Sequence, residues 1–116
     1  MAQDFTRYAV QATNSAGTVF TANSNDAVIG IRVTNILTST ITIDVFVSVG
    51  GSTTRYIAKD LSIPPASSVE LVSGGAKFVM QSTDVLKVEA SAASAADVYV
   101  SVVVQLVLNS KGIKNG

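Results

Sequence analysis

The sequence predicts an all-β protein, a single antiparallel β-sandwich or jelly roll of about eight or nine short strands that spans residues 1–116. The clearest observation is the strict alternation of Thr40–Val49, whose aliphatic residues share one face: Ile41, Ile43, Val45, Val47 and Val49. A helix would scatter these side chains, because its period is about 3.6 residues. Turn residues also recur roughly every ten residues, and no convincing helical period is found. These observations favour two packed sheets.

The remaining strands are expected where alternating stretches lie between turn signals. In chain order the expected strands are Phe5–Ala12, Thr18–Thr21, Ala27–Ile36, Thr40–Val49, Thr53–Ile63, Ser68–Ser73, Lys77–Gln81, Val85–Ser91 and Asp97–Leu108. Gly50-Gly51 predicts a tight two-residue hairpin turn, since glycine tolerates positive φ. Gly74-Gly75 predicts a second turn, and Gly30 predicts a bulge or a close packing contact. Pro64-Pro65 ends a ladder because proline lacks the N–H donor.

Alternation also predicts which side chains face the core. Leu86, Val88 and Ala90 are expected to face inward. In other strands the apolar residues that share one face are Tyr8 with Val10, Ile29 with Ile31 and Val33, and Val69 with Leu71. Thr53–Ile63 alternates less cleanly, and its inward face stays open. Asp97–Leu108 is apolar on both faces, which either a central strand or a subunit interface explains. The candidate subunit interface comprises Val98, Val100, Val102, Val103, Val104, Leu106, Val107 and Leu108.

The composition argues against several classes of function. The chain has no cysteine and no histidine, so it lacks thiolate ligands, disulfides and the usual general base. Eight basic and eight acidic residues cancel, and only 14% of residues are charged, which favours association and suggests life inside an assembly. The N-terminus shows no secretory signal, and no stretch is long enough for a membrane helix, so we expect an unexported chain or one released by lysis. Met1–Asp4 and Asn109–Gly116 are expected to be flexible or arm-like ends.

No residue set has the pattern of a catalytic or ligand site. The acids are expected at outward positions or in turns, and without a histidine or a suitable lysine no serine is activated. We therefore expect no enzyme activity, and no catalytic, cofactor-binding or metal-binding residues. Basic residues are spread along the whole chain, which argues against nucleic acid as a partner. A sugar-binding module would need a stacking platform from Tyr8, Tyr56 or Tyr99, since tryptophan is absent.

From Ala27 to Leu106 the order of features resembles small β-sandwich virion structural proteins of tailed bacteriophages, particularly cyanophages. A recurrent run in that family is a strand, Ile-Pro, small polar residues, a strand, Gly-Gly, a strand, an acidic turn and a strand. Here it reads Ile63-Pro64-Pro65-Ala66-Ser67-Ser68, then Gly74-Gly75, then Asp84-Val85-Leu86-Lys87-Val88. The match covers about two thirds of the chain. One departure is Ser82-Thr83-Asp84, where a glycine before the aspartate is more usual, and this leaves the turn geometry open.

The resemblance implies a structural subunit located in the virion and present in many copies. It implies a head decoration (cement) protein that associates with itself, as a homotrimer, and docks on other virion proteins such as the major capsid protein. A neck, tail or fibre component is the alternative within this class. A host-surface carbohydrate-binding module is the alternative from another class. No nucleic acid, membrane or cofactor is expected as a partner.

Overall fold

The computed structural model describes residues 2–72 and 77–106, except the side chains of residues 2, 3, 105 and 106. Within these residues every regular element is a β-strand. The strands are β1 (Ala2–Ala12), β2 (Gly17–Thr21), β3 (Asp26–Asn35), β4 (Ile41–Val49), β5 (Thr53–Ile63), β6 (Ser68–Glu70), β7 (Phe78–Met80), β8 (Val85–Ala90) and β9 (Ala96–Leu106). They match the expected strands to within a few residues at each end.

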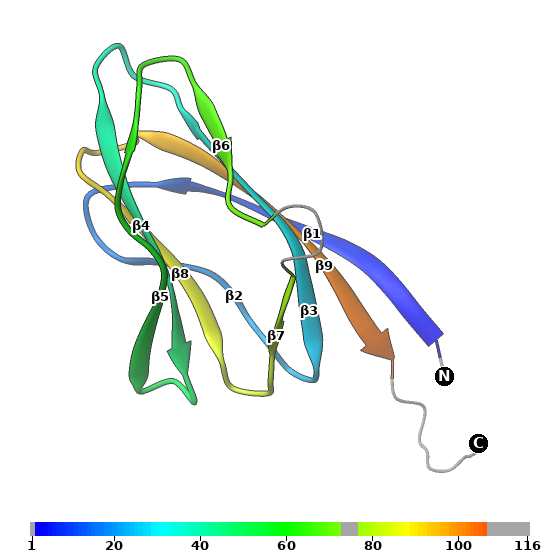
Figure 1. Cartoon of the computed structure of the whole chain (residues 1–116). Coiled ribbons are helices and arrows are strands. Elements are labelled where there is room, and N and C mark those ends of the chain that lie inside the picture. Colours follow the sequence, from blue (N-terminus) through cyan, green and yellow to red (C-terminus); the bar gives the residue numbers. More distant parts are fainter. Residues whose placement is uncertain (1, 73–76, 107–116) are drawn as a thin grey trace.

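The strand pairs nest inside one another like the two arms of a long hairpin. β1 pairs with β9, β2 with β8, β3 with β6 and β7, and β4 with β5, all antiparallel. This hairpin is folded over, so that β9 also meets β3 and β8 also meets β4. The result is sheet A, with order β1-β9-β3 followed by β6 and β7, and sheet B, with order β2-β8-β4-β5 (Figure 1). This strand order is a jelly roll, which confirms the predicted fold class.

The two sheets bury one apolar core between their inner faces. β4 contributes Ile41, Ile43, Val45 and Val47, as its alternation predicts, whereas Val49 is exposed at the end of the hairpin. β9 contributes Val98, Val100 and Val102, and β8 contributes Leu86, Val88 and Ala90. Tyr8 and Val10 of β1 pack against this core from the predicted face. The apolar character of β9 is therefore explained by its central position in sheet A, between β1 and β3.

The hairpin between β4 and β5 is confirmed. Gly50 and Gly51 have φ of 63° and 79°, the left-handed region that glycine adopts without a Cβ clash. The Ser52 N–H donates to the Val49 carbonyl at 3.2 Å. Pairing resumes at Val49 and Thr53, so three residues, rather than two, separate the paired positions. The second predicted glycine turn, Gly74-Gly75, lies outside the described residues.

β3 contains the irregularity that Gly30 predicts, and the irregularity changes one inward residue. The register with β9 shifts between Val28 and Gly30, as in a bulge. Val28, Ile31 and Val33 are therefore buried, and Ile29 lies half-buried on the other face. The prediction that Ile29 shares a face with Ile31 and Val33 was wrong, because strict alternation does not allow for an extra residue.

β5 alternates poorly because its pairing with β4 shifts register twice, between Ile43 and Val45 and again between Val45 and Phe46. Ala58, Leu61 and Ile63 pack against or within the core. Asp60 has φ of 53°, which is uncommon for a residue with a Cβ and marks the first irregularity. The inward face that the sequence left open is therefore set by two local insertions.

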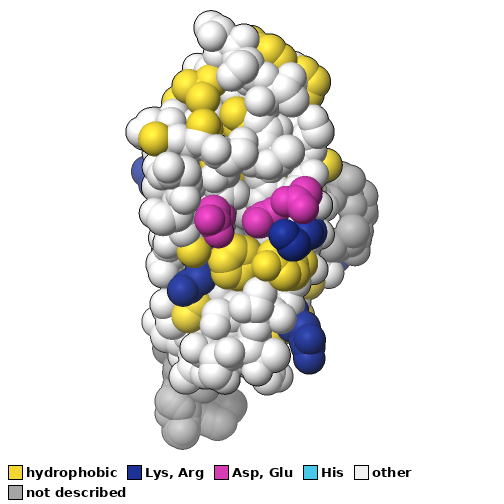
Figure 2. Space-filling view, turned by 90° about the vertical axis from the view of Figure 1, so that its left-hand side faces the viewer, with side chains coloured by type: hydrophobic (Ala, Val, Ile, Leu, Met, Phe, Trp, Pro, Cys, Tyr) yellow, Lys and Arg dark blue, Asp and Glu magenta, His cyan; other side chains and the backbone are white. Residues whose placement is uncertain are grey.

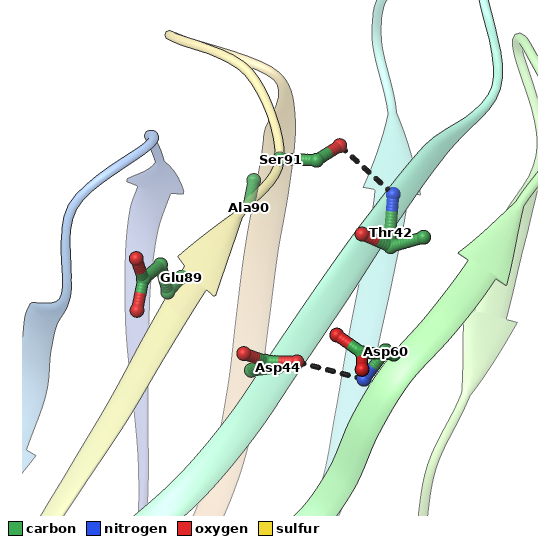
Figure 3. A pocket seen from close by; sticks show the side chains of 6 residues that line it. All are labelled: Thr42, Asp44, Asp60, Glu89, Ala90 and Ser91. Atoms are coloured by element: carbon green, nitrogen blue, oxygen red, sulfur yellow. Dashed lines mark hydrogen bonds between the residues drawn. The ribbon is translucent and has the colours of Figure 1, made fainter.

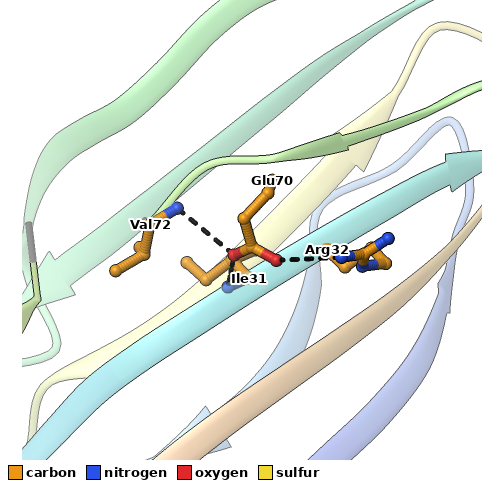
Figure 4. Close-up of polar contacts among 4 residues, drawn as sticks. All are labelled: Ile31, Arg32, Glu70 and Val72. Carbon is orange, nitrogen blue, oxygen red and sulfur yellow. Dashed lines mark hydrogen bonds and ion pairs between the residues drawn. The ribbon is translucent and has the colours of Figure 1, made fainter. Parts of the chain in front are cut away.

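The edge of sheet A opposite β1 is divided between β6 and β7, and Glu70 bridges part of the gap. Its Oε2 accepts the Ile31 N–H at 2.7 Å and the Val72 N–H at 3.4 Å (Figure 4). Its Oε1 lies 3.7 Å from Arg32 Nη2. A side-chain carboxylate thus takes the place of a strand carbonyl beside the bulge of β3, and so satisfies a backbone donor.

Two further positions bear on the predictions from sequence. Thr83 has φ of 78°, so the turn at Ser82-Thr83-Asp84 uses the conformation that a glycine would adopt most readily. β1 begins at Ala2, and Ala2–Asp4 pairs with Val104, Gln105 and Leu106 of β9, so these residues are strand and not an arm. Asn109–Gly116, the other expected arm, lies outside the described residues.

Candidate interaction surface

The candidate interface residues of the last strand divide into separate groups. Val98, Val100 and Val102 are fully buried in the core of the same chain, so they are not available on an outer surface. Val103 and Val104 are half-buried, and Val104 packs against the core. Leu106 belongs to β9, but its side chain is not described. Val107 and Leu108 lie outside the described residues. Of the described side chains in this set, Val103 alone faces the outer side of sheet A.

Val103 belongs to an apolar row that crosses the outer face of sheet A. Direct cross-strand pairing joins Phe5 to Val103, Val103 to Ala27, and Ala27 to Val79. Phe5 is 73% exposed and Val79 is 63% exposed, which is unusual for side chains of this size. The row thus runs from the β1 edge of the sheet to the β7 edge. We refer to these four residues as the apolar row.

A shallow hollow of about 340 Å³ adjoins the apolar row on the same face. Its wall includes Phe5, Ile29 and Tyr99, and Arg7 lies beside it. Ser101, which also lines the hollow, pairs with Gly30 on one side and with Arg7 on the other. A Cβ at Gly30 would lie 3.6 Å from Glu70 Oε2 and 3.8 Å from Ser101 Cβ, which are ordinary van der Waals contacts. The hollow and the row together form a continuous apolar area on this face, since Phe5 belongs to both.

The outer face of sheet B is of a different kind, because acidic and basic side chains lie side by side on it (Figure 2). Asp44, Asp60 and Glu89 line a hollow of about 160 Å³ together with Thr42 and Ser91 (Figure 3). The Asp60 N–H donates to Asp44 Oδ1 at 2.7 Å. Sequence analysis placed these acids outward, but it did not bring them together, because they come from three strands.

Lys59 neutralises part of this acidic group. Its Nζ lies 3.8 Å from Asp44 Oδ2 and 3.6 Å from Asp60 Oδ2. The carboxylate of Asp44 chiefly, and then that of Asp60, raises the pKa of Lys59 above its ordinary value of 10.5. Lys59 also lies 5.2 Å from the ring centre of Tyr56, which in turn packs against Phe46 at 5.5 Å. One lysine is therefore paired with two carboxylates, so the negative charge of this acidic group is neutralised only in part within the chain.

The three tyrosines do not form one exposed cluster. Tyr8 stacks on Phe20 with ring centres 4.3 Å apart, between the two sheets. Tyr56 and Tyr99 are each 50% exposed, Tyr56 on the outer face of sheet B and Tyr99 on that of sheet A. A platform for sugar stacking would need neighbouring aromatic faces on one surface. The three tyrosines lie on three different surfaces, so they do not form such a platform with one another.

The described residues contain neither a metal-binding cluster nor a membrane-spanning helix. Across residues 2–72 and 77–106, no group of three or more acidic side chains is arranged to hold a metal ion. In the same part of the chain, no helix is long and apolar enough to cross a membrane.

Comparison with known proteins gives likeness in structure and not in sequence. No protein-family model and no curated protein sequence matches the chain. A chain from Bacillus endospore appendages, which form disulfide-linked pili, has 17% identity and a TM-score of 0.53, and the match covers 90% of this chain and 88% of that one. A chain from the acid-stable capsid of the Helicobacter pylori bacteriophage KHP30 has 12% identity and a TM-score of 0.55, with 89% and 86% covered.

A third similar structure is a chain of the T13 IBDV viral particle, with 14% identity and a TM-score of 0.54. That match covers 89% of this chain but only 31% of the viral one, so this chain corresponds to one part of a larger protein. At these identities the likeness establishes the fold alone. This chain therefore shares its all-β fold with chains from viral capsids and from a pilus.

Of the apolar row, the sequence predicted only Val103 as an interface residue. Phe5, Ala27 and Val79 lie in different strands, and only the register of β1, β9, β3 and β7 brings them together. A signal was present in Phe5 and Val79, because each lies between residues of the opposite face. That signal shows which residues point outward, but it does not show that they adjoin.

Proposed function

We propose that this chain is a bacteriophage virion structural protein that associates with itself and docks on other virion proteins. The observation that carries the proposal is the apolar row on the outer face of sheet A, with two large side chains more than half exposed. Exposed apolar residues that adjoin one another are typical of surfaces that become buried in an assembly. The fold likeness to capsid and pilus chains supports the same reading by analogy.

Within this class we propose a head decoration (cement) subunit that stabilises the capsid. The family resemblance is the basis for this assignment, and it implies a homotrimer that docks on the major capsid protein. It further implies that the chain works without catalysis, cofactor or metal. A neck, tail or fibre component remains the alternative location, because the same sandwich serves either place in the resembling family.

The copy number per purified particle separates these locations. Quantitative mass spectrometry of intact virions is expected to find hundreds of copies if the chain is a cement subunit. About three to a few tens of copies would move the chain to the neck, tail or fibres, as expected for a ring or spike. Absence from the particle would overturn the virion role.

The role of the apolar row is tested by particle binding. Val79→Lys places a charge in the row at an exposed position, so the fold is expected to persist while binding to particles that lack the protein falls at least tenfold. Ile57→Lys is the matched control, because Ile57 is also exposed but belongs to sheet B. Equal binding by both variants and the wild type would remove the row from the docking surface.

A further inference from the structure

The four sheet edges differ in how well they are protected against pairing with another chain. β2 is five residues long and has a register shift, and β6 and β7 are three residues each. β5 has two register shifts, and it carries Arg55, Lys59 and Asp60. β1 is 11 residues long and pairs with β9 from Ala2 to Ala12 without a shift. Bulges, short length and charge protect edges. β1 carries the charged residues Asp4 and Arg7, but it has neither a bulge nor a short length.

The outer edge of β1 has backbone groups that need partners. In an antiparallel pair, alternate residues direct both their N–H and C=O groups toward the neighbouring strand, so the others direct theirs away. In the described part of the chain no strand pairs with β1 on the side away from β9. The N-terminal half of β1 also runs away from sheet B, which leaves this edge uncovered (Figure 1). The edge is therefore a template for one more strand.

We propose that β1 of a second copy of this chain occupies the edge, antiparallel to the first, about a two-fold axis through Thr6. The two copies of sheet A then form one continuous sheet whose outer faces lie on the same side. This inference deepens the proposed self-association and rests on it. Such a contact is isologous, because the same residues are used by both copies.

The sequence of β1 selects this register. A two-fold axis perpendicular to the sheet keeps each side chain on the same face in both copies, and directly opposed residues also point to one face. The residue nearest the axis must therefore lie opposite its own copy. An axis at Asp4 or Arg7 would place like charges opposite each other, which is unfavourable. An axis at Phe5 would pair fewer residues, since β1 begins at Ala2. An axis at Thr6 pairs Ala2–Val10 with no like charges opposed.

This register also makes favourable side-chain pairs on both faces of the sheet. On the outer face, Phe5 lies opposite Arg7 of the second copy, and a guanidinium over an aromatic ring is attractive. On the inner face, Asp4 lies opposite Tyr8 of the second copy, an acceptor opposite a donor. Each pair occurs twice by symmetry. The exposed ring of Phe5 thereby gains a cover that it lacks in the single chain.

The first test is the mass of the purified full-length chain by analytical ultracentrifugation. The wild type is expected to contain an even number of chains, because a homotrimer whose β1 edges pair becomes a hexamer. Phe5→Lys is expected to halve the mass, since two cations would then oppose each other across the axis. Adding Arg7→Glu to Phe5→Lys is expected to restore it by placing opposite charges there. Val79→Lys, in the same row at the opposite edge, is expected to leave the mass unchanged.

A wild-type protein that is monomeric or trimeric would overturn the pairing. A loss of mass in Val79→Lys equal to that in Phe5→Lys would also overturn it, because the contact would then use the face and not the edge. These outcomes leave the virion role to be decided by the copy number in particles. Conversely, an edge-paired protein that is absent from virions would overturn the proposed function and not the pairing.

The second test fixes the register by disulfide trapping. The chain has no cysteine, so Thr6→Cys introduces a single thiol beside the axis. Two such thiols on directly opposed residues are close enough for a disulfide, and mild oxidation is expected to give a covalent dimer. Ala9→Cys is the control, because its two copies would lie about 20 Å apart along the strands. Cross-linking of both variants alike, or of neither, would overturn this register.

Other occupants give different results. If residues 107–116 of a neighbouring copy fill the edge, deleting them abolishes association and Thr6→Cys gives no covalent dimer. If a foreign virion protein fills it, the purified chain is monomeric or trimeric at all concentrations. Either result would overturn the proposed contact between two copies of β1.

Discussion

β1 and β5 are both edge strands of 11 residues, yet they are built in opposite ways. β1 pairs with its neighbour without interruption, and its outward residue Phe5 is 73% exposed. The pairing of β5 shifts register twice. β5 also contains Asp60, whose φ is positive, and Lys59, which is ion-paired with Asp44. The chain thus protects the β5 edge against pairing with another chain and leaves the β1 edge regular. An edge that remains regular in a sandwich of this size is a candidate for assembly.

The largest loss in the free energy of unfolding is expected from a change in β9, the strand that pairs with β1. Val102 is fully buried in β9, so Val102→Asp places an unpaired charge in the core and should cost about 4 kcal/mol or more in the free energy of unfolding. Chemical denaturation followed by circular dichroism measures the loss. Val103→Asp is the control, since Val103 points to the outer face and should cost far less. Equal stability of both variants would contradict the burial of β9.

A smaller loss in the free energy of unfolding is expected from a change in Asn35, which binds the end of β5. The buried Asn35 donates from Nδ2 to the carbonyls of Ile63 and Pro64, at 3.0 and 3.1 Å, and its Oδ1 accepts the Leu37 N–H at 2.8 Å. Asn35→Ala leaves these groups without partners and should reduce the free energy of unfolding by about 2–4 kcal/mol. Asn23→Ala, at an exposed loop position, should change it by less than about 0.5 kcal/mol. Matching denaturation midpoints for the two variants would argue against this anchor.

A still smaller loss in the free energy of unfolding is expected from a change in Glu70, at the edge of sheet A that β6 and β7 share. Glu70→Ala removes the acceptor of the Ile31 N–H and the partner of Arg32, at a site that remains partly exposed. The expected loss in the free energy of unfolding is about 1–2 kcal/mol. Hydrogen exchange at Ile31 should accelerate, while exchange in the β4–β5 pair should not. An unchanged rate at Ile31 would show that the carboxylate does not protect this amide.

The smallest effect concerns the charges of β5. The pKa of Lys59 is raised in the folded chain, so its ion pairs stabilise the fold below pH 10.5, and that contribution is lost as pH rises through the raised pKa. Thermal unfolding of the wild type and of Lys59→Gln should therefore differ slightly at pH 8 and converge above the raised pKa. A difference that persists unchanged at high pH would refute the pairing.

Local sequence was sufficient for the strands and for the fold class. β4 was predicted from alternation alone, because a half-buried strand needs only its own period of two. Gly50 and Gly51 predicted their hairpin, because a positive φ is a property of the residue and its immediate neighbours. The turn at Thr83 shows the limit of this reasoning, since a β-branched residue there takes the conformation expected of glycine.

Tertiary structure decided everything that depends on which strands adjoin. The inward face of β5 and the choice of Val28 over Ile29 follow from bulges, which appear only when a strand is paired with its neighbour. The apolar row and the acidic hollow each combine residues from three or more strands, so register and not spacing brings them together. The alternation of β1 puts Phe5 on the face opposite Tyr8 and Val10. Only the packed sheets showed that its strand is a long, unbroken edge.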